Sequence, residues 1–169
     1  PPKKNTASII ESFYKAGIQI KMITGDYAAT AIAIAQQIGL KSEAATLTGN
    51  EIMEMDDSTL SKAVSKTNLF VRMFPDAKLK VVEALKRNGE VVAMTGDGVN
   101  DAPAVKSADI GVAMGAAGTD IAMEAADVVV AGGKVGDGHG VSPDRWVLRR
   151  RMVRHLAWHS MYTESRYFP

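Results

Sequence analysis

The chain has 169 residues, a formal net charge of +1 and a hydrophobic content of 46%. These values suit one α/β domain with a sizeable core, and the small charge gives no sign of a nucleic-acid or membrane-surface partner. The absence of cysteine excludes disulfides and thiolate metal sites. No apolar run approaches the ~20 residues of a spanning helix and we see no signal peptide, so we expect the chain taken alone to be soluble.

Hydrophobic periodicity predicts alternating strands and helices over the first 130 residues. Short, unalternated apolar runs predict buried strands at 18–23, 69–72, 91–94, 110–114 and 127–130. Helices are predicted at 5–16, 27–38, 51–55, 58–65, 75–88, 101–107 and 119–126, with Gly17, Gly39 and Gly89 as stops. In the helix at 75–88 we expect Leu79, Val82 and Leu85 to face inward. This order predicts an α/β fold, a doubly wound parallel sheet covered by helices on both faces.

A dense polar loop follows the strand at 91–94, with the sequence TGDGVND. Its two carboxylates, Asp97 and Asp101, would repel each other unless a cation or several donors lay between them. The alternative is a polar turn in which Asn100 or Asp101 caps the next helix. Either arrangement places charged groups at the carboxyl end of a buried strand.

The strand at 18–23 also runs into Thr-Gly-Asp, at Thr24, Gly25 and Asp26. Loops at the carboxyl ends of parallel strands converge on one crevice, so we expect this loop to meet Asp97 and Asp101 there. Thr24 or Asp26 could instead simply cap the following helix.

The expected site combines the groups that phosphoryl transfer needs. Thr24 supplies a hydroxyl, Lys78 a mobile positive charge and Asn100 an amide. Asp97 and Asp101 supply oxygen ligands of the kind that Mg²⁺ prefers. Such catalysis consists mostly of positioning and charge neutralisation. For Lys78, and for Arg72 just after a strand, the alternative is an ordinary surface position.

Two signatures of nucleotide-binding loops and one of a phosphoryl-accepting aspartate are absent from the sequence. There is no G-x-x-x-x-G-K-[ST] loop, and Gly96 and Gly98 do not complete a G-x-G-x-x-G pattern. No strand carries an Asp-x-x-Gly-Thr nucleophile. The site therefore has the assisting groups of a phosphoryl transfer without the group that accepts the phosphoryl.

Three segments resemble the phosphorylation domain of P-type cation-transporting ATPases, in the haloacid-dehalogenase-like superfamily. They are MITGD at 22–26, RMFPDAKLKVV at 72–82 and MTGDGVNDAPAVKSADIGVAMG at 94–115, with a continuation to residue 130. The sequence TGDGVNDAPA is most similar to that of the branch of Ca²⁺, Na⁺/K⁺ and H⁺ pumps, and among these we prefer a calcium pump. The resemblance covers residues 1–130, as the C-terminal part of that domain.

The resemblance implies a role for each matching residue. Thr24 and Gly25 match the loop that holds the phosphoryl group, and Lys78 matches the lysine that bridges phosphate and nucleophile. Asp97 matches the Mg²⁺ ligand, with Asn100 and Asp101 completing the loop around phosphate and metal. Asp26 and Arg72 match residues that lie near the bound ATP or support the site.

The chain departs from the family pattern in what surrounds these segments. The Asp-Lys-Thr-Gly-Thr segment, the nucleotide-binding and actuator domains and every membrane helix are missing. The sheet is thus expected to be incomplete, because the strand carrying the nucleophile would be central, and its neighbours should expose apolar edges. The resemblance implies a parent pump in the membrane with this domain in the cytoplasm, moving a cation through the missing membrane domain.

Residues 131–169 form a separate, atypical tail, rich in glycine and arginine. Residues 1–130 carry a net charge of −3 and the tail a net charge of +4. The segment Gly136-Asp137-Gly138-His139-Gly140, if its codons are read one nucleotide later, is compatible with Ala-Thr-Val-Thr-Ala, close to the family sequence. We expect a tail that is disordered or out of its ancestral reading frame, with no nucleic-acid role for its arginines.

Three functions remain open from the sequence. The first is a fragment of an ATP-driven cation pump, itself inactive. The second is a soluble phosphatase of the same superfamily, which would need its own nucleophilic aspartate. The third is a catalytically inactive remnant that binds Mg²⁺ or phosphate.

Overall fold

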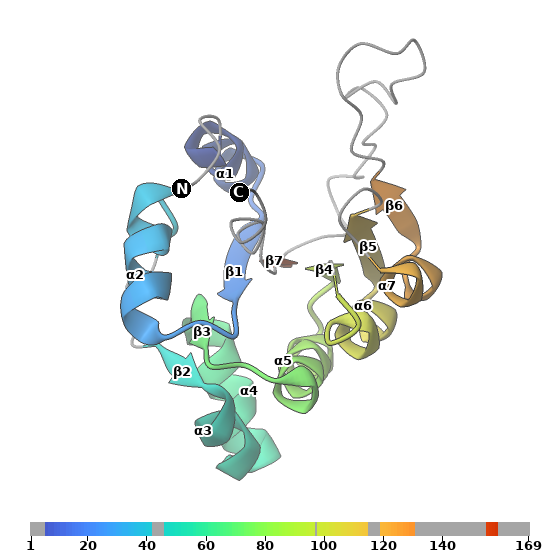
Figure 1. The fold of residues 1–169 in the computed structure, drawn as a ribbon. Coiled ribbons are helices and arrows are strands. Elements are labelled where there is room, and N and C mark those ends of the chain that lie inside the picture. Colours follow the sequence, from blue (N-terminus) through green and yellow to red (C-terminus); the bar gives the residue numbers. More distant parts are fainter. Residues whose placement is uncertain (1–5, 42–45, 97, 115–118, 131–154, 159–169) are drawn as a thin grey trace, which may run out of the picture.

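The computed structural model describes residues 6–41, 46–96, 98–114, 119–130 and 155–158. Helices and strands alternate along these residues, as expected from the periodicity (Figure 1). The helices are α1 (Thr6–Lys15), α2 (Ala28–Gln37), α3 (Gly49–Glu54), α4 (Asp57–Lys66), α5 (Pro75–Arg87), α6 (Ala102–Ser107) and α7 (Asp120–Ala125). The strands are β1 (Gln19–Ile23), β2 (Leu47–Thr48), β3 (Leu69–Val71), β4 (Val92–Gly96), β5 (Ile110–Met114), β6 (Val128–Val130) and β7 (His155–Trp158).

The strands form one sheet in the order β2-β3-β1-β7-β4-β5-β6. Every pairing between the described strands is parallel. Because all strands point the same way, the loops that follow β1, β3 and β4 lie at one edge of the sheet. The predicted doubly wound parallel fold is confirmed.

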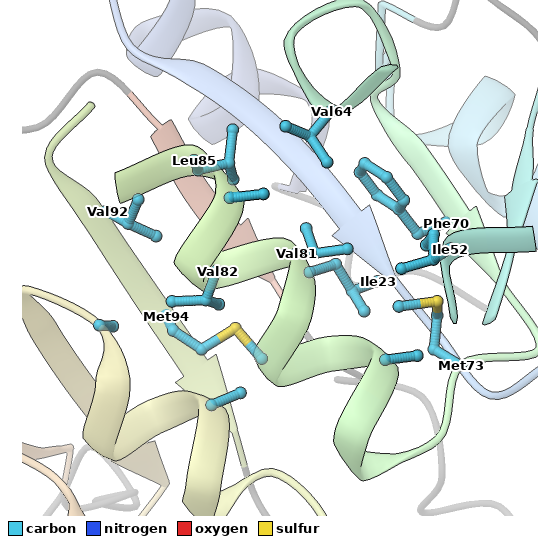
Figure 2. Close-up of a cluster of buried hydrophobic side chains, with 14 of the residues drawn as sticks. Ile23, Ile52, Val64, Phe70, Met73, Val81, Val82, Leu85, Val92 and Met94 are labelled. Atoms are coloured by element: carbon cyan, nitrogen blue, oxygen red, sulfur yellow. The ribbon is translucent and has the colours of Figure 1, made fainter. Parts of the chain in front are cut away.

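Helix α5 anchors the larger hydrophobic core, on one face of the sheet (Figure 2). Val81, Val82 and Leu85 of α5 lie between Ile23 of β1 and Met94 of β4, all fully buried. Helices α3, α4 and α6 add further side chains to the same cluster, namely Ile52, Leu60, Val64, Ala104 and Val105. This core therefore connects the two halves of the sheet.

A second, smaller cluster covers the opposite face of β1 and β3. Ile10 of α1 and Ala31 and Ala35 of α2 pack there on Ile20 and Leu69. Helices thus cover both faces of the sheet at β1, as in other doubly wound folds.

Local signals set most element boundaries to within one or two residues. Gly17, Gly39 and Gly89 follow α1, α2 and α5 with positive φ, as their role of helix stop predicts. Two details differ from expectation. Leu79 of α5 is only half-buried, whereas Val81 and Ala84 are fully buried, and the short strand β2 falls where no strand was predicted.

Strand β7 changes the expected picture of the sheet centre. It comes from the far end of the chain and pairs with both β1 and β4, where the sequence predicted an empty central position with exposed edges. That expectation is wrong, because these backbone groups find partners in His155–Trp158. The same four residues also differ from the expectation of a disordered tail, whose other residues lie outside the described part of the chain.

The described residues contain no candidate for a membrane-spanning helix. None of their helices combines the length and the apolarity that crossing a bilayer requires.

Candidate functional site

The loops after β1 and β3 are joined by backbone hydrogen bonds at the carboxyl edge of the sheet. The Thr24 amide donates to the Phe70 carbonyl at 2.9 Å, and the Met73 amide donates to the Thr24 carbonyl at 3.0 Å. The Thr24 hydroxyl is buried and accepts from the Asp26 amide at 3.1 Å. The hydrogen bonds of Thr24 therefore fix the conformation of the Thr-Gly-Asp loop and its position beside the loop after β3.

Neither Thr24 nor Asp26 is the N-cap of α2. That position belongs to Tyr27, whose side chain makes no capping hydrogen bond. The capping alternative for these two residues is thus wrong. Gly25 and Asp26 are exposed, so a ligand can approach the loop from this side.

Arg72 lies against this loop in a strained conformation. Its φ is 53°, which is uncommon for a residue other than glycine, and its amide donates to the Asp26 carbonyl at 3.0 Å. Its guanidinium lies 4.3 Å from the centre of the Tyr27 ring. Because Tyr27 is 70% exposed, the pair forms a cationic rim beside the loop.

The second half of the site is a buried ion pair between α5 and the loop after β4. Lys78 Nζ lies 2.7 Å from Asp101 Oδ1, and the two side chains are 4% and 1% exposed. Asp101 occupies the N-cap position of α6, but its side chain does not cap that helix. The surface alternative for Lys78 and the capping alternative for Asp101 are both wrong.

Gly96 makes room for this ion pair. A Cβ atom at Gly96 would lie 2.5 Å from Cβ of Asp101 and 2.9 Å from Cγ2 of Val105. Those are distances that real side chains do not reach, so residue 96 must be glycine for Asp101 to take its position. This packing role of Gly96 was not predicted from the sequence. The only signal for it was the position of Gly96 in the TGDGVND motif.

Strand β7 separates the two halves of the site. Met22 of β1 and Thr95 of β4 share Trp158 as their register partner, so the two strands end level with each other. Neighbouring strands lie about 4.8 Å apart, which places the two loops about 10 Å from each other across β7. A phosphate-sized group between them could reach both.

The remaining predicted residues are placed as follows. Asn100 is exposed on the loop after β4, and Arg72 is exposed beside Asp26. Asp97 lies outside the described residues. Within the described part, Lys78 and Asp101 come together, and Thr24 to Asp26 come together with Arg72.

The donor set suits a hard cation. Its described acidic groups are the carboxylates of Asp101 and Asp26, and oxygen ligands are those that Mg²⁺ prefers. Oδ1 of Asp101 is bonded to Lys78, so a metal or its water would share this carboxylate with the lysine. Among the described residues no group of three His, Asp or Glu side chains could hold a metal by itself.

The comparisons with known proteins agree with this architecture. A family model described as "Hydrolase: haloacid dehalogenase-like hydrolase" matches residues 1–109. The chain is 48% identical over 133 residues to "Calcium-transporting ATPase 1" of Saccharomyces cerevisiae, covering 77% of this chain and 14% of that protein. It is 49% identical over 131 residues to human "Calcium-transporting ATPase type 2C member 1", with the same coverage.

A bacterial relative and a solved structure extend the comparison. Identity is 47% over 135 residues to "Probable cation-transporting ATPase F" of Mycobacterium tuberculosis, covering 77% of this chain and 15% of that protein. The solved catalytic domain of the CPx-ATPase CopB-B matches with a TM-score of 0.56 and 28% identity, over 76% of this chain and 40% of that one. The chain thus spans about a seventh of the length of these curated relatives. By sequence and fold, it belongs to the haloacid dehalogenase-like hydrolase family and is homologous to the cation-transporting P-type ATPases within it.

Proposed function

We propose that residues 1–130 are part of the phosphorylation domain of an ATP-driven cation pump, with calcium as the transported ion. The observation that carries this proposal is the buried pair of Lys78 and Asp101, facing the Thr24 loop across one strand. A buried lysine at the carboxyl edge of a parallel sheet is suited to an anionic substrate. Identity near 48% to calcium-transporting ATPases supports the choice of ion.

Each residue contributes binding or orientation in this proposal. The Thr24 hydroxyl and the Gly25 amide donate to the phosphoryl oxygens, and the Lys78 ammonium neutralises their charge. Asp101 holds that ammonium in place, and Asn100 donates an amide hydrogen. Asp26 and Arg72 contact the nucleotide from the rim. Such electrostatic positioning accounts for most of the catalysis in phosphoryl transfer.

Magnesium would be held by Asp97 together with Asp101, directly or through water. When bound, the ion neutralises charge on the transferred phosphoryl group. The parent pump would supply the nucleotide-binding, actuator and membrane domains as partners. In that pump this domain would lie on the cytoplasmic side of the membrane.

The chain as given is proposed to bind rather than to react. In the described part of the chain the central position of the sheet is filled by His155–Trp158, which include no carboxylate. An aspartyl-phosphate needs an aspartate nucleophile, here expected on a segment outside this sequence. This observation favours an inactive Mg²⁺- and phosphate-binding segment over a self-sufficient phosphatase.

Calorimetric titration of the full 169-residue chain with ATP, with and without Mg²⁺, tests the proposal. We expect binding that requires Mg²⁺ and is lost in Lys78→Ala and Asp97→Asn. Lys106→Ala, an exposed lysine on α6, is the matched control and should bind as the parent chain does. Equal binding by all four proteins, or none by the parent chain, would contradict the proposal.

A further inference from the structure

A pocket of about 590 Å³ opens at the amino-terminal edge of the sheet, opposite the loops described above. Residues before β1, the end of α1, the segment after α2 and the turn between α4 and β3 line it. Its volume falls in the range of small-molecule sites, about 300–1,000 Å³. The strand ends at this edge play no part in the proposed phosphoryl-transfer site.

One wall of the pocket is fixed by a continuous chain of contacts. Lys21 Nζ donates to the Asn68 side-chain oxygen at 3.2 Å, and Asn68 Nδ2 donates to the Lys41 carbonyl at 2.7 Å. The Lys41 amide in turn donates to the Tyr14 hydroxyl at 2.9 Å. Four separate segments are thereby held together, so the wall is pre-organised.

The wall carries an excess of positive charge. Lys41 and Lys66 line the pocket, and Asp and Glu do not occur among its lining residues in the described chain. Lys21 lies fully buried behind Asn68, where it also donates to the Thr67 carbonyl at 2.7 Å. The negative charge of Glu90 interacts with Lys21 and offsets its positive charge. The positive charges of Lys41 and Lys66 therefore remain as the net charge of the wall.

The remaining surface of the pocket is partly apolar. Lys41 Nζ lies 4.8 Å from the centre of the Tyr14 ring, which keeps the ammonium beside an aromatic side chain. Ile18 and Gly17 line the pocket next to it. A ligand with both an anionic and an apolar part would contact both surfaces.

We propose that this pocket binds a small organic phosphate, with its phosphate group between Lys41 and Lys66 and its apolar part against Tyr14 and Ile18. Charge-assisted hydrogen bonds to a phosphate are about twice as strong as neutral ones, so the two lysines provide most of the selectivity. The site lies at the other edge of the sheet from Lys78, so it does not depend on the proposed ATPase function.

Amide chemical-shift mapping of the full chain with phenyl phosphate tests the proposal. The expected result is perturbation of Gly17, Gln19 and Asn68, with weaker binding of inorganic phosphate at the same amides. Perturbation confined to Gly25 and Thr95, or no binding at concentrations on the order of 10 mM, would overturn it.

The variants for this test are exposed lysines, chosen to leave the fold intact. Lys41→Gln combined with Lys66→Gln should raise the dissociation constant on the order of tenfold. Lys62→Gln, an exposed lysine of α4 that does not line the pocket, should leave it unchanged. An equal effect of the double variant and the control would overturn the proposal, and thermal melts check that all variants fold.

Vesicles distinguish a soluble phosphate from a lipid headgroup. We expect no cosedimentation with phosphatidylcholine vesicles that contain phosphatidic acid. Binding to these vesicles without any response to phenyl phosphate would overturn the proposal and assign the pocket to a membrane lipid.

Discussion

The ammonium of Lys78 lies 2.7 Å from Oδ1 of Asp101, and both side chains are almost completely shielded from water. Removing either partner leaves a buried charge without its counter-charge. We therefore expect Lys78→Met and Asp101→Leu each to lower the free energy of unfolding by roughly 3–5 kcal/mol.

The double variant supplies the control for this pair. Lys78→Met/Asp101→Leu removes both charges, so its loss should be much smaller than the sum of the single losses. Urea unfolding measures all four free energies. Strictly additive losses would show that the two side chains do not stabilise each other.

Gly96 supports the same ion pair by leaving space beside Asp101. We expect Gly96→Ala to displace Asp101 and Val105 and to lower the free energy of unfolding by about 1–3 kcal/mol, the range for overpacking. Gly98→Ala is the matched control, since a Cβ there meets no atom within 4 Å. Equal melting temperatures for the two variants would refute this account of Gly96.

Because Lys21 is buried, we expect the free energy of unfolding to rise with pH in the alkaline range. Burial lowers the pKa of Lys21 from 10.5 to about 8, and the neighbouring Glu90 partly opposes the shift. Between these values the unfolded chain binds more protons than the folded one, so stability rises with pH by up to roughly 3 kcal/mol.

Urea unfolding between pH 7 and 11 measures this rise. Lys21→Met should lack it, while the exposed control Lys62→Met should retain it. At pH 7 the gain from removing the buried charge is offset in part, because Thr67 and Asn68 lose a donor. The same pH slope in Lys21→Met and the parent chain would show that Lys21 is not the titrating group.

Tyr27 is expected to hold the Arg72 guanidinium beside the Thr-Gly-Asp loop. If the proposed ATP site is correct, Tyr27→Leu should weaken Mg²⁺-dependent ATP binding by about two- to fivefold, the size of an exposed cation–π contact. Tyr27→Phe retains the ring and should bind as the parent chain does. Calorimetric titration measures both, and equal losses in the two variants would point to a role of the hydroxyl instead.

Because strand β7 pairs with β1 and β4, we expect removal of residues 131–169 to lower the stability of the chain. A chain ending at Val130 should leave the facing edges of β1 and β4 without partners, and should therefore melt earlier and associate. Size-exclusion chromatography and thermal melts of the two chains measure this. A monodisperse monomer of residues 1–130 that melts cooperatively at the parent temperature would contradict the placement of β7.

Much of the fold follows from local signals in the sequence. Short segments rich in apolar residues predicted β1, β3, β4 and β5, because the strands of a parallel sheet are buried on both faces. The position of the Thr24 loop and the Asp101 loop at the same edge of the sheet then followed from strand direction alone.

Other features depend on tertiary contacts that no local pattern reports. Strand β7 is four residues long and pairs with strands more than 50 residues away, so its position could not be derived from periodicity. Lys21 looks like a polar position in a strand, and its burial depends on hydrogen bonds to the Thr67 carbonyl and Asn68 and on the nearby carboxylate of Glu90. The two-residue strand β2 is too short to leave any pattern.

The central claim is that residues 1–130 belong to a cation pump, and the coding DNA on both sides of this segment tests it most directly. We expect the frame upstream of Pro1 to encode Asp-Lys-Thr-Gly-Thr and membrane spans, and the DNA beyond Val130 to resume the pump sequence in a shifted frame. An upstream region without these segments, followed by a start codon directly before Pro1, would contradict the assignment to a pump.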